Sequence, residues 1–117
     1  MHRKLKAAFC LLGFAGVAFG AFGAHALQAK VTLTQLETWK TATLYLFAHT
    51  LAGLLSLSQS QNQWPARLFL VGCLLFPFSL YGLVLFELRF LGPITPLGGL
   101  CFLAGWLLFA RESLRSR

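Results

Sequence analysis

The chain is poor in charge, and acidic side chains are the scarcest of all. Only 11% of its 117 residues are charged, whereas a soluble domain carries about 25%. Three acids stand against ten lysines and arginines, and all three, Glu37, Glu87 and Glu112, lie at the ends of apolar stretches. Small multidrug exporters of similar length rely on an acidic residue inside the membrane. The absence of such a residue disfavours an exporter of that kind.

Motifs for catalysis and metal binding are missing as well. The three cysteines, Cys10, Cys73 and Cys101, lie far apart within apolar stretches. They form no CxxC pair, and their odd number argues against a complete disulfide framework, so we expect them to be small packing residues. No nucleophile–base pair and no phosphate-binding glycine loop is present. We therefore expect no catalytic residue, no metal site and no cofactor, and the sequence gives no positive indication of an enzyme.

What the chain does have is four long apolar stretches. They are Ala7–Ala26, Thr41–Leu57, Ala66–Phe86 and Leu91–Ala110. Each is about long enough to cross a hydrocarbon core of roughly 30 Å as a helix. The sequence predicts an all-α protein, an integral membrane four-helix bundle that occupies residues 1–117 as a single domain. Its helices are expected at about 7–26, 35–58, 65–88 and 96–112, with the first retained as a helix rather than cleaved as a signal peptide.

Lysines and arginines divide unequally between the two sides of a four-span chain. Seven lie on the side of the termini and the second loop, namely Arg3, Lys4, Lys6, Arg67, Arg111, Arg115 and Arg117. Three lie on the other side, namely Lys30, Lys40 and Arg89. Because the more positive side faces the cytoplasm, both termini are predicted to be cytoplasmic. The basic residues form no stripe interleaved with aromatics, so the expected partner is the lipid bilayer and not a nucleic acid.

Local signals place the starts of three helices. Thr34 and Glu37 have the spacing of a capping box, which predicts a helix start at the second span. Trp64-Pro65 and Thr95-Pro96 open the third and fourth spans, since proline is tolerated in a first helical turn.

Glycines at helical spacing mark one face of the first span. Gly13, Gly16, Gly20 and Gly23 follow one another at intervals of three and four. Small residues allow helices to approach closely in a bilayer, where packing rather than the hydrophobic effect drives association. The stripe is therefore predicted to be a helix-packing face, either against another helix of the same chain or against a second copy in a homodimer.

A few polar residues within or beside the spans form a candidate intramembrane polar site: His25, Tyr45, His49, Ser79, Tyr81 and Thr95. His49 lies near the middle of its span, with Tyr45 one turn earlier on the same face. Ionisable residues inside a membrane are functional candidates. A Tyr–His pair that holds helices together explains the same pattern, and both interpretations stay open.

Five short blocks along the chain carry a family resemblance. In order they are Gly20–Leu27, Trp39–His49, Leu75–Tyr81, Leu91–Gly99 and Gly105-Trp106. Together they resemble the YgdD-like inner-membrane proteins, the family known as domain of unknown function 423 and related to transmembrane protein 256 of eukaryotes. Pro77-Phe78 departs from the small residues expected before Ser79. The resemblance implies a multi-pass protein of the bacterial inner (plasma) membrane and implies no established activity.

Three functions are compatible with these observations. The first is a structural or interaction protein that binds a membrane-protein partner or itself as a homo-oligomer. The second is a small oligomeric transporter or channel that uses His49 as a polar intramembrane site. The third is a lipid- or quinone-binding membrane protein, for which the histidines and tyrosines are the evidence.

Overall fold

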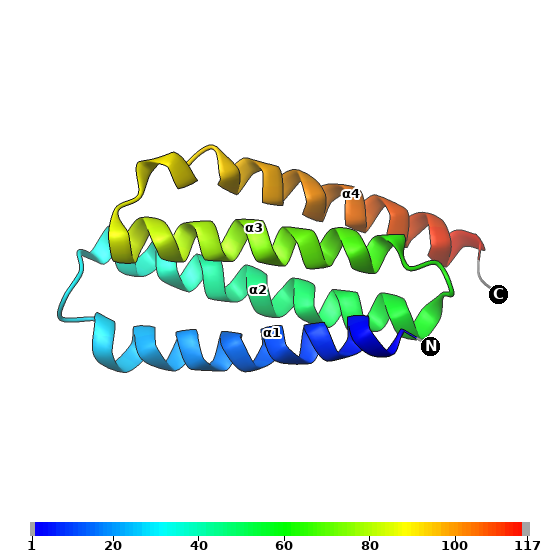
Figure 1. The fold of residues 1–117 in the computed structure, drawn as a ribbon, viewed down its shortest axis with the longest axis horizontal. Helices are drawn as coiled ribbons and strands as arrows, with labels where there is room; N and C mark the ends of the chain where they lie inside the picture. The colour runs from blue at the N-terminus through cyan, green and yellow to red at the C-terminus, as the bar shows by residue number, and fades with distance from the viewer. Residues whose placement is uncertain (1, 116–117) are drawn as a thin grey trace.

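The computed structural model describes residues 2–115, which contain helices and no strand. The four long helices are α1 (Arg3–Phe22), α2 (Leu33–Gln59), α3 (Trp64–Phe86) and α4 (Ile94–Arg115) (Figure 1). A π-helical segment, Gly23–Leu27, continues α1, and a short 3-10 turn, Arg89–Leu91, precedes α4. Each long helix, taken with these extensions, is long and apolar enough to cross a membrane. The predicted all-α four-helix membrane fold is confirmed.

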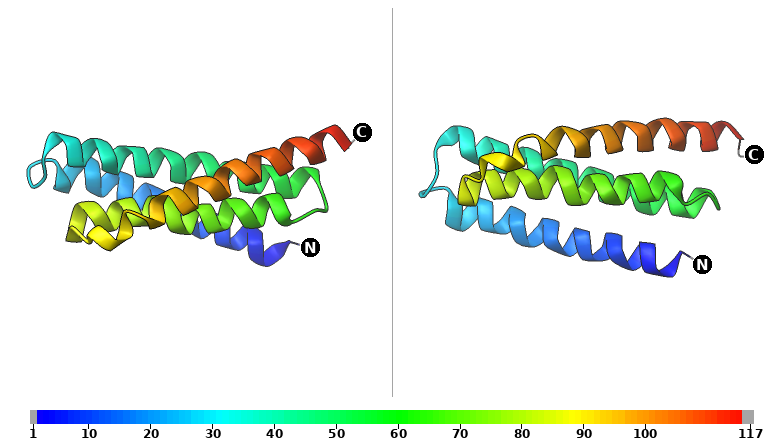
Figure 2. Two further views of the ribbon diagram at one scale, coloured as in Figure 1. Left: turned by 90° about the horizontal axis from the view of Figure 1, so that it is seen from above. Right: turned by 45° about the horizontal axis from the view of Figure 1, so that its top comes forward.

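The helices form an open arrangement rather than a closed ring. Successive helices run antiparallel, so the first and last described residues lie at the same end of the molecule (Figure 1). The central pair is α2 and α3, with α1 packed mainly on α2 and α4 packed mainly on α3 (Figure 2). Within residues 2–115, α1 makes no contact with α4. The four described helices are therefore not arranged in a ring around a common central axis.

The start of α2 differs from the predicted one. Thr32, and not Thr34, is the N-cap: its hydroxyl accepts a hydrogen bond from the Gln35 backbone N–H at 3.1 Å. The Gln35 side-chain oxygen accepts from the Thr32 backbone N–H at 2.9 Å. Glutamine serves in this reciprocal pair as well as glutamate does. The box therefore forms two residues before the Thr34–Glu37 pair that the sequence favoured.

The other helix bounds differ because hydropathy marks only the part of a helix that lies in hydrocarbon. α1 and α4 begin before the predicted residues 7 and 96, and α4 continues to Arg115. α3 instead ends at Phe86, before the predicted residue 88, because Glu87 takes a left-handed backbone conformation with φ 52°. Residues other than glycine adopt that conformation rarely, so the sequence held no signal for this end.

The glycine stripe of α1 faces α2. A Cβ added at Gly16 would lie 2.7 Å from Cε1 of Phe47, and one at Gly23 would lie 2.5 Å from Cδ1 of Trp39. Real Cβ atoms do not approach side chains so closely, so these two glycines admit aromatic rings that any larger residue would displace. The other two glycines of the stripe leave room for a methyl group.

A second glycine contact joins α3 to α4, which the sequence analysis did not single out. A Cβ at Gly98 would lie 2.5 Å from the backbone nitrogen of Phe76, and one at Gly105 would lie 2.8 Å from Cε1 of Phe69. Backbone-to-backbone approach of this kind requires glycine. These glycine contacts hold α4 close to α3, whereas α4 touches α2 at few places.

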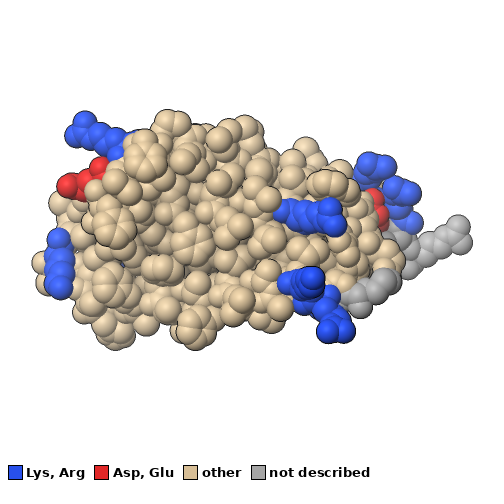
Figure 3. Space-filling view, in the orientation of Figure 1, with Lys and Arg blue, Asp and Glu red and all other residues tan. Residues whose placement is uncertain are grey.

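On the face shown in Figure 3, charged side chains lie at the left end and over the right third of the molecule, and none lies in the stretch between them. The middle carries large exposed apolar side chains such as Phe14 on α1 and Leu107 on α4. Such a belt is suited to contact with lipid chains rather than water.

Candidate functional site

Four of the six predicted polar residues lie at three separate places. His25 is exposed in the π-helical segment after α1. The Ser79 hydroxyl, on α3, hydrogen-bonds to the hydroxyl of Thr95 on α4. The Tyr81 hydroxyl lies 2.7 Å from the hydroxyl of Thr43 on α2. The last two contacts join helices, and none of the three places is shared with the remaining pair.

Tyr45 and His49 lie together on α2, and His49 uses both of its ring nitrogens. Its Nδ1 lies 2.8 Å from the backbone oxygen of Tyr45. The indole N–H of Trp106, on α4, donates to Nε2 at 3.0 Å. An indole can only donate and a carbonyl oxygen can only accept. The network therefore assigns a neutral imidazole with its proton on Nδ1, a tautomer that ties α2 to α4.

Aromatic rings enclose this imidazole. The Phe102 ring stacks on it with centroids 3.6 Å apart, and the Tyr45 ring lies nearly parallel to it at 5.7 Å. Trp106 approaches edge-on at 5.8 Å. Trp106 is part of a family block but was not among the predicted site residues, and Phe102 was not predicted either. The available signal was an indole N–H inside an apolar span, which needs an acceptor on a neighbouring helix.

A groove lies beside this cluster, between α2 and α4. Its volume is about 630 Å³. It is lined by Tyr45, His49, Phe76, Pro96, Gly99, Leu100, Phe102, Leu103 and Trp106. None of these side chains is charged, and several are aromatic. The groove exists because α4 follows α3 and touches α2 at few places, so no helix of the described chain covers this flank.

The Tyr45 hydroxyl is the unusual group of the groove. Tyr45 is 40% exposed and lies one residue from the midpoint of the 27-residue α2. Its hydroxyl makes no hydrogen bond within residues 2–115. In hydrocarbon an unpaired hydroxyl costs several kcal/mol, so a partner from outside the chain would be favoured at this position.

A second aromatic cluster lies between α1, α2 and α3, and its polar atoms are all paired. The Trp39 indole N–H donates to the backbone oxygen of Phe19 at 2.8 Å. Tyr81 stacks on Phe19 at 4.4 Å and bonds to Thr43. Trp39 and Tyr81 are 1% and 2% exposed. We call Phe19, Trp39, Thr43 and Tyr81 the closed cluster. We call Tyr45, His49, Phe102 and Trp106 the open cluster.

Metal-binding geometry is absent from the described residues. No group of three histidine, cysteine or acidic side chains within residues 2–115 lies close enough to hold an ion.

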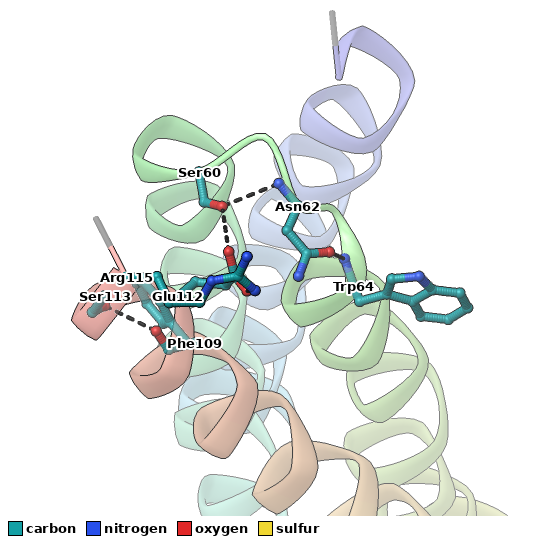
Figure 4. Close-up of polar contacts among 7 residues, drawn as sticks. All are labelled: Ser60, Asn62, Trp64, Phe109, Glu112, Ser113 and Arg115. Carbon is teal, nitrogen blue, oxygen red and sulfur yellow. Dashed lines mark hydrogen bonds and ion pairs between the residues drawn. The ribbon is translucent and has the colours of Figure 1, made fainter. Parts of the chain in front are cut away.

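A polar contact lies at the end where α4 finishes. The Ser60 hydroxyl donates to Glu112 at 3.2 Å, and Arg115 lies 3.5 Å from the same carboxylate (Figure 4). This contact ties α4 to the turn between α2 and α3.

Comparison with known proteins gives consistent matches. The chain is 43% identical over 97 residues to a UPF0382 membrane protein of Staphylococcus aureus, a match that covers 79% of this chain and 80% of the relative. It is 40% identical over 104 residues to a UPF0382 membrane protein of Staphylococcus epidermidis, with 85% of each chain covered. A UPF0382 membrane protein of Schizosaccharomyces pombe is 39% identical over 105 residues, covering 82% of this chain and 89% of the relative.

No solved structure matches the chain. The sequence profile described as "Protein of unknown function (DUF423)" matches residues 19–99, a range that contains α2, α3 and the first turns of α4. Together with four membrane-capable helices, these matches identify a small multi-pass membrane protein of unknown activity that belongs to the DUF423 family.

Proposed function

We propose that the protein binds a neutral, lipid-soluble molecule of the quinone type in the groove between α2 and α4. The observation that carries the proposal is the Tyr45 hydroxyl, which has no hydrogen-bond partner in the described chain and belongs to a residue near the middle of the membrane-capable helix α2. A ligand carbonyl or hydroxyl would satisfy it. The apolar lining of the groove would accommodate the tail of such a ligand.

The lining restricts the chemistry of the ligand head. No charged side chain reaches the groove, so a charged head would be desolvated without compensation. A phospholipid headgroup belongs at the membrane surface, whereas Tyr45 lies roughly 18 Å along α2 from its first residue at about 1.5 Å per residue. Flat rings can stack on the aromatic wall formed by Phe76, Phe102 and Trp106. A neutral ring that carries carbonyl groups meets these conditions.

A proton-relay transporter is a poorer fit to the same residues. Both nitrogens of His49 are engaged, one by the Tyr45 carbonyl and one by Trp106. A second proton on Nε2 would face the indole N–H and break the link between α2 and α4. His49 in this proposal is a positioning residue that holds one wall of the groove.

The setting of this activity is also part of the proposal. The excess of lysine and arginine on the side of the termini supports cytoplasmic termini. The staphylococcal relatives are named membrane proteins. We propose the bacterial plasma membrane as the location, where isoprenoid quinones dissolve in the lipid phase.

The test is retention of a decyl-substituted benzoquinone by the purified protein, counted by native mass spectrometry after release from nanodiscs. Gly99→Leu places an apolar side chain at the groove lining, and its Cβ would meet only Cδ2 of Phe76, at 4.0 Å. We expect Gly99→Leu to bind the benzoquinone at least tenfold more weakly. A tenfold loss of affinity corresponds to about 1.4 kcal/mol of binding free energy. Ala18→Leu, which adds the same side chain to an exposed position of α1, is the matched control.

Equal binding by Gly99→Leu and the control would place the quinone elsewhere and contradict the proposal. Absence of binding by the unaltered protein would also contradict it. That second result would favour the structural or interaction role that the sequence predicted first.

A further inference from the structure

A basic hollow lies between the beginnings of α1 and α3. Its volume is about 530 Å³, and it is lined by His2, Arg3, Lys4, Leu5, Gln63 and Arg67. Three of these six residues carry a permanent positive charge, and none is acidic. The hollow is at the opposite end of the molecule from the loop that joins α1 to α2, and it shares no lining residue with the groove of Tyr45.

One cationic group that lines this hollow, the Arg67 guanidinium, is held by neighbouring side chains. The Arg67 guanidinium donates to the Gln63 side-chain oxygen at 3.1 Å and lies 5.1 Å from the centroid of the Trp64 ring. The amide nitrogen of Gln63 lies 2.6 Å from Nδ1 of His2. This chain of contacts links α1 to α3 and orients Arg67 before any ligand arrives, which lowers the cost of binding an anion.

Donor groups around the hollow remain unused. Nε2 of His2 is enclosed by protein and has no hydrogen-bond partner within residues 2–115. His2, the N-cap of α1, makes no side-chain cap hydrogen bond. At the start of α3 the Trp64 N–H donates to the Asn62 side-chain oxygen at 3.0 Å, so the uncapped first turn at this hollow is that of α1. The free N–H groups of a first helical turn carry partial positive charge and favour anions. The hollow therefore combines fixed charge with unsatisfied donors.

We propose that this hollow binds the phosphate of an anionic phospholipid headgroup. The apolar stretches of α1 and α3 begin immediately beside it, at Ala7 and Ala66, which puts the hollow at the level of the headgroups. Leu5 offers an apolar contact to the glycerol end of the acyl chains. The one acidic residue at this end of the described chain, Glu112, lies beside Ser60 and Arg115 on α4 (Figure 4) and does not line the hollow.

The experiment uses the full chain in nanodiscs that contain equal amounts of phosphatidylglycerol and phosphatidylcholine. After extraction, native mass spectrometry counts the phospholipids that stay bound. The unaltered protein should retain phosphatidylglycerol in preference to phosphatidylcholine. Arg67→Gln should lower that retention about fivefold, the effect of one cation near an anionic lipid. Arg111→Gln removes one charge from an exposed position at the same end but outside the hollow, and should leave retention unchanged.

If Arg67→Gln lowers the yield of folded protein, Lys4→Gln provides a second test. Lys4 is exposed, and its side chain makes no hydrogen bond or ion pair within residues 2–115. Equal losses in Arg111→Gln and the hollow variants would mean diffuse charge attraction and overturn the proposal. Equal retention of the two phospholipids would overturn it as well. Displacement of the lipid by inorganic phosphate would assign the hollow to a free anion instead.

Discussion

The protein contains two aromatic clusters built from the same kinds of residue, and they differ in what covers them. The closed cluster contains Trp39 and Tyr81, and α1 lies over it. The open cluster contains Trp106 and Tyr45, and no helix of the described chain lies over it. In both, the indole N–H bonds to a neighbouring helix, to the Phe19 carbonyl in one case and to His49 in the other.

The difference appears in the tyrosines. Tyr81 is almost fully buried, and its hydroxyl is paired with Thr43. Tyr45 is exposed, and its hydroxyl has no partner within residues 2–115. Aromatic residues thus serve packing in the closed cluster, where a third helix covers them. In the open cluster, where that cover is missing, they form the surface at which we propose that a lipid-soluble ligand binds.

Removal of the two indole rings should separate the clusters by the largest margin. Trp39→Ala deletes a fully buried ring and should destabilise the fold by about 3–5 kcal/mol. Trp106→Ala deletes a ring that is 45% exposed, so a clearly smaller loss is expected. Denaturant titration in mixed micelles, followed by circular dichroism, measures both. Equal losses would mean that the open cluster is as much a packing core as the closed one.

The contact between α1 and α2 can be tested within the glycine stripe itself. Gly16→Ala drives a methyl group into the Phe47 ring and should destabilise by about 1–3 kcal/mol. Gly13→Ala meets only the Thr50 methyl at 4.0 Å and is the matched control, expected to change little. The same titration provides the measurement. If Gly16→Ala is as stable as Gly13→Ala, α1 does not pack on α2 through this stripe.

The His49 link is the structural element of the open cluster. His49→Leu leaves the Trp106 N–H without an acceptor and should destabilise by about 1–3 kcal/mol. His49→Gln keeps an acceptor and a donor and should lose less. The ¹⁵N spectrum of the unaltered imidazole should show the pattern of the Nδ1–H tautomer. An Nε2–H pattern would contradict the bond from Trp106.

The smallest expected effect on stability comes from the tyrosine hydroxyls. Tyr81→Phe breaks the bond to Thr43 and should lower stability by about 0.5–1.5 kcal/mol. Tyr45→Phe breaks no bond within the described chain and should leave stability unchanged or raise it slightly. Unfolding midpoints of the two variants decide this. A loss in Tyr45→Phe equal to that in Tyr81→Phe would show that its hydroxyl has a protein partner.

Hydropathy alone was sufficient to predict the four helices and their order, because a bilayer demands about twenty apolar residues per span. It could not place helix ends that lie outside hydrocarbon. The start of α2 is set by a capping box of Thr32 and Gln35, which was not among the predicted helix signals. The end of α3 depends on the left-handed backbone conformation of Glu87, which no residue pattern in the sequence predicts.

The candidate site was predictable only in part. Tyr45 and His49 were predicted to lie on one face of α2 because they are four residues apart on the same helix. Periodicity could not reveal that Trp106, 57 residues further along the chain, supplies the donor to His49. Nor could it separate Tyr81 from Tyr45, because the position of α1 over one cluster and not over the other is a property of the assembled helices.

The most direct measurement is the affinity for the decyl-substituted benzoquinone of Tyr45→Phe and Tyr81→Phe, compared side by side in the same nanodiscs. Loss of one hydrogen bond at Tyr45 should weaken binding by about 0.5–1.5 kcal/mol, roughly twofold to tenfold. Tyr81→Phe should bind as the unaltered protein does, although it is the less stable of the two. If both variants bind equally well, the Tyr45 hydroxyl does not recognise the ligand, and the assignment of binding to the open cluster is wrong.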